Sequence, residues 1–175
     1  LAAPFDRHTW TFVDALSVEM RSAYWAAVNP GVVTSEGEDL HFIVDRLVDA
    51  GRHRTAFYVL QHRPQRVGTP RLVAILNAIS SGAEPEGGQV DGWWIGEALA
   101  ALEADSEFPR RELALLQYRW FDALRHSKHR AQVLFDELSR DPAFFMDLVR
   151  LATSGDDPEV STATRTHAWS ILHEG

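Results

Sequence analysis

The sequence contains no cysteine, which excludes disulfides, thiolate metal sites and a cysteine nucleophile. Lysine is almost absent too: every basic residue except Lys128 is an arginine, which we interpret as the codon bias of a GC-rich bacterial genome. No apolar run approaches the roughly 18 residues of a membrane-spanning helix, and no signal peptide follows Leu1. We therefore expect a cytoplasmic chain without a membrane partner. Because position 1 is not Met, we expect a piece of a longer protein.

Basic residues are also few relative to acidic ones. The chain has 17 Lys and Arg against 25 Asp and Glu, a net charge of -8. This balance counts against a nucleic-acid partner, because phosphate binding relies on clustered cations. With 175 residues and 45% hydrophobic content, the chain is expected to be globular, with one domain over 1–175 or two small ones packed together. The spacing of the apolar residues favours a single all-helical domain. The flexible loop expected at 83–90 is the point where that domain could subdivide.

Strand signals are nearly missing, since there is no long alternating run and no Asn-Gly or Asp-Gly hairpin. Apolar residues instead recur at helical spacing, and the prolines fall where helices should start or stop. Ser17, Asp91 and Asp141 are predicted N-caps, as is Thr69 before Pro70. The expected helices span about 7–16, 17–28, 39–50, 53–62, 70–82, 92–102, 109–124, 128–140, 142–151 and 159–173.

Strong helix entry points fall near positions 37, 69, 109 and 141, and each interval holds two helices. This spacing is typical of antiparallel helical hairpins. The sequence therefore predicts an all-α fold, with hairpins stacked as an irregular α-solenoid or as a compact helical bundle. The tetratricopeptide and ankyrin consensus patterns are both missing. The choice between an irregular α-solenoid and a compact bundle therefore stays open.

Motifs for catalysis and metal binding are missing as well. There is no Gly-x-Ser-x-Gly, Walker loop or His-Glu-x-x-His. The pair His126 and His129 straddles a predicted helix break without an acidic third ligand. We interpret 125–130 as a basic, solvated turn at a helix end, where cations are favoured. We assign no catalytic, metal-binding or cofactor-binding residue.

Tryptophan is abundant, with six in the chain. Four of them lie in apolar stripes and are expected in the core: Trp10, Trp25, Trp120 and Trp169. Trp93 and Trp94 differ, because adjacent helical residues point about 100° apart and cannot share one stripe. Either a helix between two neighbours buries both, or one is exposed as an anchor for a partner.

Two arginine-rich turns could also meet a partner. Arg63, Arg66 and Arg71 lie in the stretch 62–71, where one predicted helix gives way to the next, and a second cluster spans 119–130. The simplest interpretation is ordinary solvated turns. The candidate partner-binding residues are therefore Trp93, Trp94, Arg63, Arg66 and Arg71.

Two stretches of the chain resemble a known kind of sequence. They include Glu38-Asp39-Leu40, Leu47-Val48-Asp49-Ala50-Gly51-Arg52, Arg54-Thr55-Ala56-Phe57, Ile95-Gly96-Glu97 and Asp141-Pro142-Ala143-Phe144-Phe145. The chain is similar here to the helical-repeat C-terminal region of large bacterial multidomain proteins, a region without an assigned function. The resemblance covers nearly the whole chain and rests on core and capping positions. It implies a helical fold and carries no catalytic residue.

The leading hypothesis is a non-catalytic protein-interaction or regulatory module, whose partner is another protein or other domains of the parent chain. One alternative is a helical enzyme in which His41 or His167 meets Glu97 or Asp45. Perturbed titration of such a group in a pocket would favour it. The other alternative is a helical nucleic-acid binder that uses the arginine-rich turns, and steep salt dependence would mark it.

Overall fold

The computed structural model describes residues 7–81, 90–155 and 157–175. Within these ranges the chain forms eleven α-helices, two short 3₁₀ helices and no strand, which confirms the predicted all-α class. The chain divides into two compact units, Leu1–Val90 (unit 1) and Asp91–Gly175 (unit 2). The predicted loop at 83–90 lies, except for Val90, outside the described residues.

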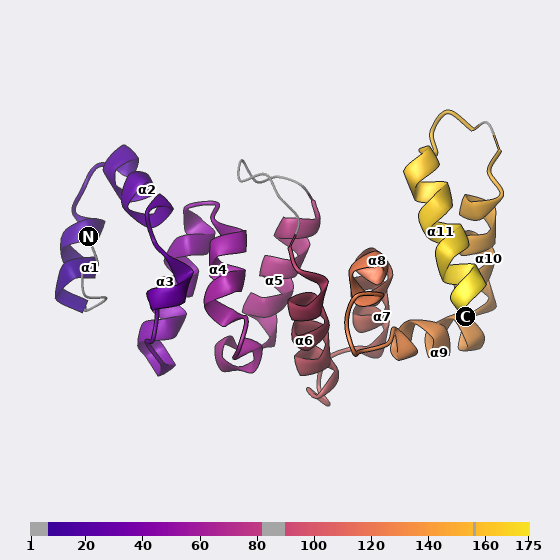
Figure 1. Cartoon of the computed structure of the whole chain (residues 1–175), viewed down its shortest axis with the longest axis horizontal. Helices are drawn as coiled ribbons and strands as arrows, with labels where there is room; N and C mark the ends of the chain where they lie inside the picture. The colour runs from indigo at the N-terminus through magenta and orange to yellow at the C-terminus, as the bar shows by residue number, and fades with distance from the viewer. Residues whose placement is uncertain (1–6, 82–89, 156) are drawn as a thin grey trace. The chain divides into compact units, whose positions relative to one another are not determined.

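Unit 1 consists of helices that are packed in the order in which the chain forms them (Figure 1). Its elements are α1 (Arg7–Asp14), α2 (Val18–Ala26), η1 (Pro30–Val32), α3 (Gly37–Asp49), α4 (His53–Leu60), η2 (Pro64–Val67) and α5 (Thr69–Ser80). Helix α4 lies between α3 and α5 and contacts both. The buried faces of these three helices supply most of the unit's core, including Leu40, Ile43, Leu47, Phe57, Leu60, Ile75 and Leu76.

Unit 2 also packs helices that are near one another in the chain, though not strictly in chain order (Figure 1). Its elements are α6 (Gly92–Glu103), α7 (Arg110–Arg119), α8 (Phe121–Leu124), α9 (Gln132–Arg140), α10 (Pro142–Ala152) and α11 (Thr162–Glu174). Helix α6 contacts α7 and α8, α7 contacts α9, and α10 packs on both α9 and α11. The single helix expected over 109–124 is wrong, because the chain leaves helical geometry at Trp120, where φ is -102° and ψ is 15°. The short helix α8 can therefore pack on α6.

Local capping follows the sequence closely. The side chains of Ser17, Asp91 and Asp141 each accept a hydrogen bond from a backbone N–H in the first turn of the following helix. The prediction for Thr69 differs by one position: Thr69 is the first residue of α5, and Gly68 precedes it with a φ of 79°. Only glycine adopts that φ without strain.

The predicted tryptophan core is partly correct. Trp10 and Trp25 are buried, but Trp169 is 54% exposed, which contradicts its prediction as a core residue. The buried residues Ala168 and Ile171 define the inward face of α11. Since each helical residue turns by 100°, Trp169 projects to the side of that face. No helix in the described part of the chain is long and apolar enough to cross a membrane.

Candidate interaction surface

The two adjacent tryptophans of α6 lie in different environments. Trp93 is 41% exposed, whereas Trp94 is partly buried and makes a contact within the chain. This is the 100° offset between neighbouring helical residues. Trp93 is therefore the member of the pair that presents an aromatic ring to solvent.

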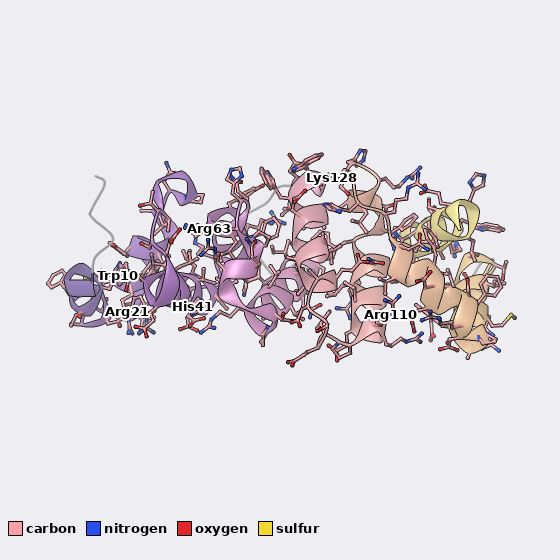
Figure 2. All side chains as sticks on the ribbon, turned by 90° about the horizontal axis from the view of Figure 1, so that it is seen from below. Trp10, Arg21, His41, Arg63, Arg110 and Lys128 are labelled. Carbon is pink, nitrogen blue, oxygen red and sulfur yellow. The ribbon has the colours of Figure 1, made fainter. Side chains whose placement is uncertain are left out.

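The ring of Trp93 lies beside a cation. The Nζ atom of Lys128 is 5.1 Å from the centre of the Trp93 ring, within the range of a cation–π interaction. Lys128 Nζ also donates to Oε1 of Glu97 at 2.7 Å, and Nε2 of His129 lies 3.1 Å from the same oxygen. These four residues form the cluster that we call the Trp93 surface. Figure 2 shows Lys128 at the periphery of unit 2.

Glu97 is the centre of this cluster. The hydrogen bond from Lys128, followed by that from His129, lowers the pKa of the Glu97 carboxyl below its ordinary value, against a smaller opposing effect of burial. Glu97 therefore stays ionised and holds Lys128 next to Trp93. The ion pair and the cation–π contact together restrict the side chains of Lys128 and Glu97.

Two glycines bring the participating segments together. Gly92 and Gly96 are four residues apart, so they lie on one face of α6. A Cβ atom on Gly92 would clash with the backbone carbonyl of Ala123, and one on Gly96 would lie 2.6 Å from the Cβ and Oγ atoms of Ser127. The close approach carries α8 and the following connection, residues 125–131, onto α6. Lys128 and His129 reach Glu97 for this reason.

A hydrogen bond with a side chain of α7 anchors the start of α9. Gln117 on α7 is 2% exposed and is the buried polar residue of the described core. Its Oε1 accepts a hydrogen bond from the backbone N–H of Leu134 at 2.8 Å. Helix α9 has no side-chain cap of its own, so Gln117 satisfies one of its first N–H groups from another helix.

A cavity of about 560 Å³ lies next to this connection, entirely within unit 2. Basic and apolar residues both line it, including Phe121, Leu124, Phe135, Arg125, His129 and Arg130. Arg125 Nε donates to Glu174 Oε1 at 2.8 Å. His129 contributes to both features, because it lines the cavity and binds Glu97 of the Trp93 surface.

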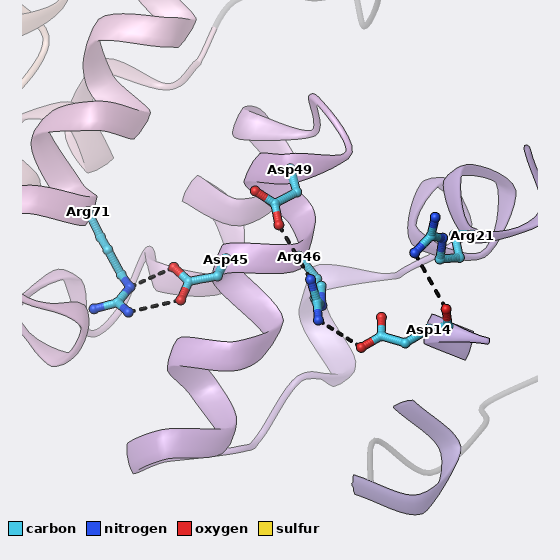
Figure 3. Close-up of polar contacts among 6 residues, drawn as sticks. All are labelled: Asp14, Arg21, Asp45, Arg46, Asp49 and Arg71. Carbon is cyan, nitrogen blue, oxygen red and sulfur yellow. Dashed lines mark hydrogen bonds and ion pairs between the residues drawn. The ribbon is translucent and has the colours of Figure 1, made fainter. Parts of the chain in front are cut away.

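The three predicted arginines of unit 1 have different surroundings. Arg63 points into its unit (Figure 2) and donates to the backbone carbonyls of Val33 and Ser35, at 2.8 Å each. Arg71 forms a bidentate pair with Asp45 at 2.6 and 2.8 Å (Figure 3). That hydrogen bond raises the pKa of the Arg71 guanidinium above its ordinary value. Arg66 is exposed. The structure thus gives Arg63 and Arg71 contacts within unit 1.

A second polar cluster surrounds a smaller cavity of unit 1, of about 340 Å³. Arg46 pairs with Asp14 at 2.7 Å and with Asp49 at 3.5 Å, and Arg21 donates to the backbone carbonyl of Asp14 (Figure 3). Two carboxylates therefore accompany the two guanidinium groups. The balance leaves no marked excess of one charge at this cavity.

His41 and His167, the histidines of the enzyme hypothesis, form hydrogen bonds with residues other than Glu97 and Asp45. Nε2 of His41 donates to the backbone carbonyl of Arg66 at 2.8 Å. His167 lies between the Asp122 carboxylate, 3.0 Å from Nδ1, and the Tyr118 carbonyl, 2.7 Å from Nε2. Tyr118 is half-buried, and this burial raises the pKa of its hydroxyl. No group of three or more potential metal ligands occurs among the residues described.

The sequence predicts that one ring of the pair Trp93 and Trp94 could be exposed, but it does not predict the residues that contact that ring. The sequence indicates Glu97 as a candidate acid of the enzyme hypothesis, His129 as half of a weak metal pair, and Lys128 as part of a solvated basic turn, but it does not indicate that the three meet. The spacing of Gly92 and Gly96 is a signal that could have found the site, since small residues four apart allow another segment to approach a helix closely.

Comparison of the chain with models of protein families, with curated proteins and with solved structures finds no match. The resemblance to helical-repeat regions of bacterial multidomain proteins therefore stays a prediction.

Proposed function

We propose that this chain is a non-catalytic protein-interaction or regulatory module of a larger, cytoplasmic bacterial protein. Its partner is another protein or another domain of the parent chain. The observation that carries the proposal is the exposed ring of Trp93, held beside Lys128 by the carboxylate of Glu97. The function is recognition through this surface of unit 2.

An exposed tryptophan that is already held in place is a suitable anchor. Tryptophan is enriched among the residues that dominate binding energy at protein interfaces. Ordering a free side chain on binding costs roughly 0.5–1.5 kcal/mol. The contact with Lys128 and the ion pair to Glu97 reduce that cost, because they restrict these side chains before binding.

The helical framework supports the same proposal. Stacked helical hairpins offer broad, shallow surfaces that suit partner proteins. The Trp93 surface combines residues from α6 and from the connection 125–131, two segments that the contacts at Gly92 and Gly96 hold together. A rigid base of this kind presents its aromatic ring in one geometry, which favours specific recognition.

The test is the capture of a binding partner and its dependence on Trp93. The chain would be immobilised, exposed to lysate of the source organism, and the retained proteins quantified by mass spectrometry. Trp169→Ala is the matched control, because Trp169 is also exposed and belongs to the same unit. Circular dichroism would establish that both variants remain folded.

We expect a stoichiometric partner that the unmodified chain and the Trp169→Ala variant retain and the Trp93→Ala variant loses. Retention of no stoichiometric partner would contradict the proposal. So would a partner that both variants bind equally well, since the interaction would then lie elsewhere.

A further inference from the structure

We propose that the unit 2 cavity beside the connection 125–131 binds an acidic peptide segment of the partner. A carboxylate of the segment pairs with Arg130, and a neighbouring apolar side chain enters the cavity. This inference rests on the proposed function and deepens it, because it assigns a chemistry to the partner. Its occupant is a carboxylate-bearing peptide and not a nucleic acid.

The size of the cavity suits part of a peptide. Its volume of about 560 Å³ lies within the roughly 300–1,000 Å³ of sites that enclose small ligands. Phe121 and Leu124, both buried, form apolar parts of its wall with Phe135. The rings of Phe121 and Phe135 meet edge to face with centres 6.0 Å apart. This wall favours an aliphatic or aromatic side chain.

The charges around the cavity leave one guanidinium group available. Glu174 pairs with Arg125, and Glu97 pairs with Lys128 and His129. Arg130 is exposed and lines the cavity, and it forms no ion pair or hydrogen bond with any residue that the structure describes. Its planar fork of donors matches the two oxygens of a carboxylate.

The start of α9 also attracts a carboxylate, though more weakly than Arg130 does. Gln132, the first residue of that helix, lines the cavity. The N-cap residue Ala131 provides no side-chain cap, the first turn holds no acidic residue, and Gln117 accepts only from the Leu134 N–H. The N-terminus of a helix carries partial positive charge. It therefore adds to the attraction that Arg130 exerts on a carboxylate.

The surrounding charge favours a peptide over a polyanion. The chain has a net charge of -8, and the carboxylate of Glu174 lies at the cavity itself. A nucleic acid presents many phosphates and needs many cations, whereas one or two carboxylates need only Arg130 and a share of Arg125. Since His129 contributes to both features, one peptide can engage the cavity and the Trp93 surface together.

The experiment begins with selection of random 12-residue peptides, displayed on phage, against the immobilised full chain. An enriched peptide is synthesised with its Asp and Glu residues, and again with Asn and Gln in their places. Affinities are measured by fluorescence anisotropy with the unmodified chain and with Arg130→Glu. The matched control is Arg140→Glu at the other end of α9, where Arg140 is exposed and contacts Glu137. Inorganic phosphate at constant ionic strength serves as a competitor.

We expect enriched peptides to combine Asp or Glu with an apolar residue. Their affinity should fall about tenfold or more with Arg130→Glu or with the amide peptide, and stay unchanged with Arg140→Glu. Enrichment without acidic residues, or equal affinity of the amide peptide, would overturn the inference. Full displacement by millimolar phosphate would also overturn it, because the cavity would then bind any small anion.

Failure of this inference is distinguishable from failure of the proposed function. If no peptide is enriched, or if Arg130→Glu does not change the affinity, the inference that the cavity binds an acidic peptide is wrong. The proposed function still stands in that case if a partner is captured in a Trp93-dependent way. If that capture fails as well, both are wrong.

Discussion

Gly96 and Ser127 are in such close contact that a Cβ atom on the glycine would lie 2.6 Å from the Oγ atom of the serine. This contact fixes the connection 125–131 on α6 and so determines where Lys128 meets Glu97 and Trp93. The position of the cation beside the exposed ring thus depends on a residue without a side chain.

We predict that Gly96→Ala and Gly92→Ala both destabilise unit 2. Alanine is favoured over glycine in a helix by about 1 kcal/mol, but overpacking typically costs about 1–3 kcal/mol. The loss should be larger at Gly92, where the added atom meets the backbone of Ala123 and not a side chain. Thermal unfolding followed by circular dichroism measures the change.

Gly31→Ala is the control for these variants. An added Cβ there would come no closer than 3.4 Å to Asn29 Oδ1, so we expect little change in melting temperature. A Gly96→Ala variant as stable as the unmodified chain would show that the connection moves away without cost. The positioning of Lys128 by Gly96 would then be wrong.

Local signals predicted most of the fold. The caps Ser17, Asp91 and Asp141 depend on residues a few positions away, so a sequence reveals them. The break at Trp120 and the exposure of Trp169 depend on which helices meet. The apolar pattern continues through both positions, and no local signal marks either one.

The candidate site was predictable only in part. The adjacent tryptophans revealed that one ring could be exposed, because the helical turn is a local property. The contacts of Glu97 with Lys128 and His129 join residues more than thirty positions apart. The same applies to Arg63, whose side chain meets the carbonyls of Val33 and Ser35. Such pairings come from tertiary packing and are not visible in residue spacing.

We predict that Glu97→Gln lowers stability at pH 7 by up to about 1 kcal/mol, the usual range of a partly exposed ion pair. Lys128, and to a smaller extent His129, lower the pKa of Glu97 in the folded state. A carboxyl with a lowered pKa stabilises the fold above its unfolded-state pKa, and this contribution is lost as the pH falls through the folded-state pKa.

The difference between Glu97→Gln and the unmodified chain should therefore shrink as the pH falls below the ordinary pKa of 4.5. Urea unfolding between pH 7 and about pH 3 measures it, because this range extends below the ordinary pKa. Glu103→Gln is the control, because Glu103 is exposed on the same helix. A difference that is constant with pH would mean that the ion pair does not stabilise the fold.

We predict that Arg63→Ala destabilises unit 1 by about 1–3 kcal/mol, whereas Arg66→Ala changes its stability by less than about 0.5 kcal/mol. Arg63 donates to three backbone carbonyls, those of Val33 and Ser35 at 2.8 Å and that of Val59 at 3.5 Å, and Val33 is buried. Arg66 lies only three residues from Arg63 in the chain, but its side chain is exposed. Urea unfolding compares the two variants, and equal stability would contradict the anchoring role of Arg63.

We predict that Gln117→Leu destabilises unit 2 by about 1–3 kcal/mol, the usual cost of a buried donor that loses its partner. The Leu134 side chain is fully buried, and its backbone N–H donates to Gln117 Oε1 at 2.8 Å. Leucine fills similar space but accepts no hydrogen bond, so the first turn of α9 should open more often. Hydrogen exchange of the Leu134 amide measures this directly and should become faster. Gln132→Leu, at an exposed position of the same turn, should leave that exchange rate unchanged, and similar rates in both variants would refute the cap.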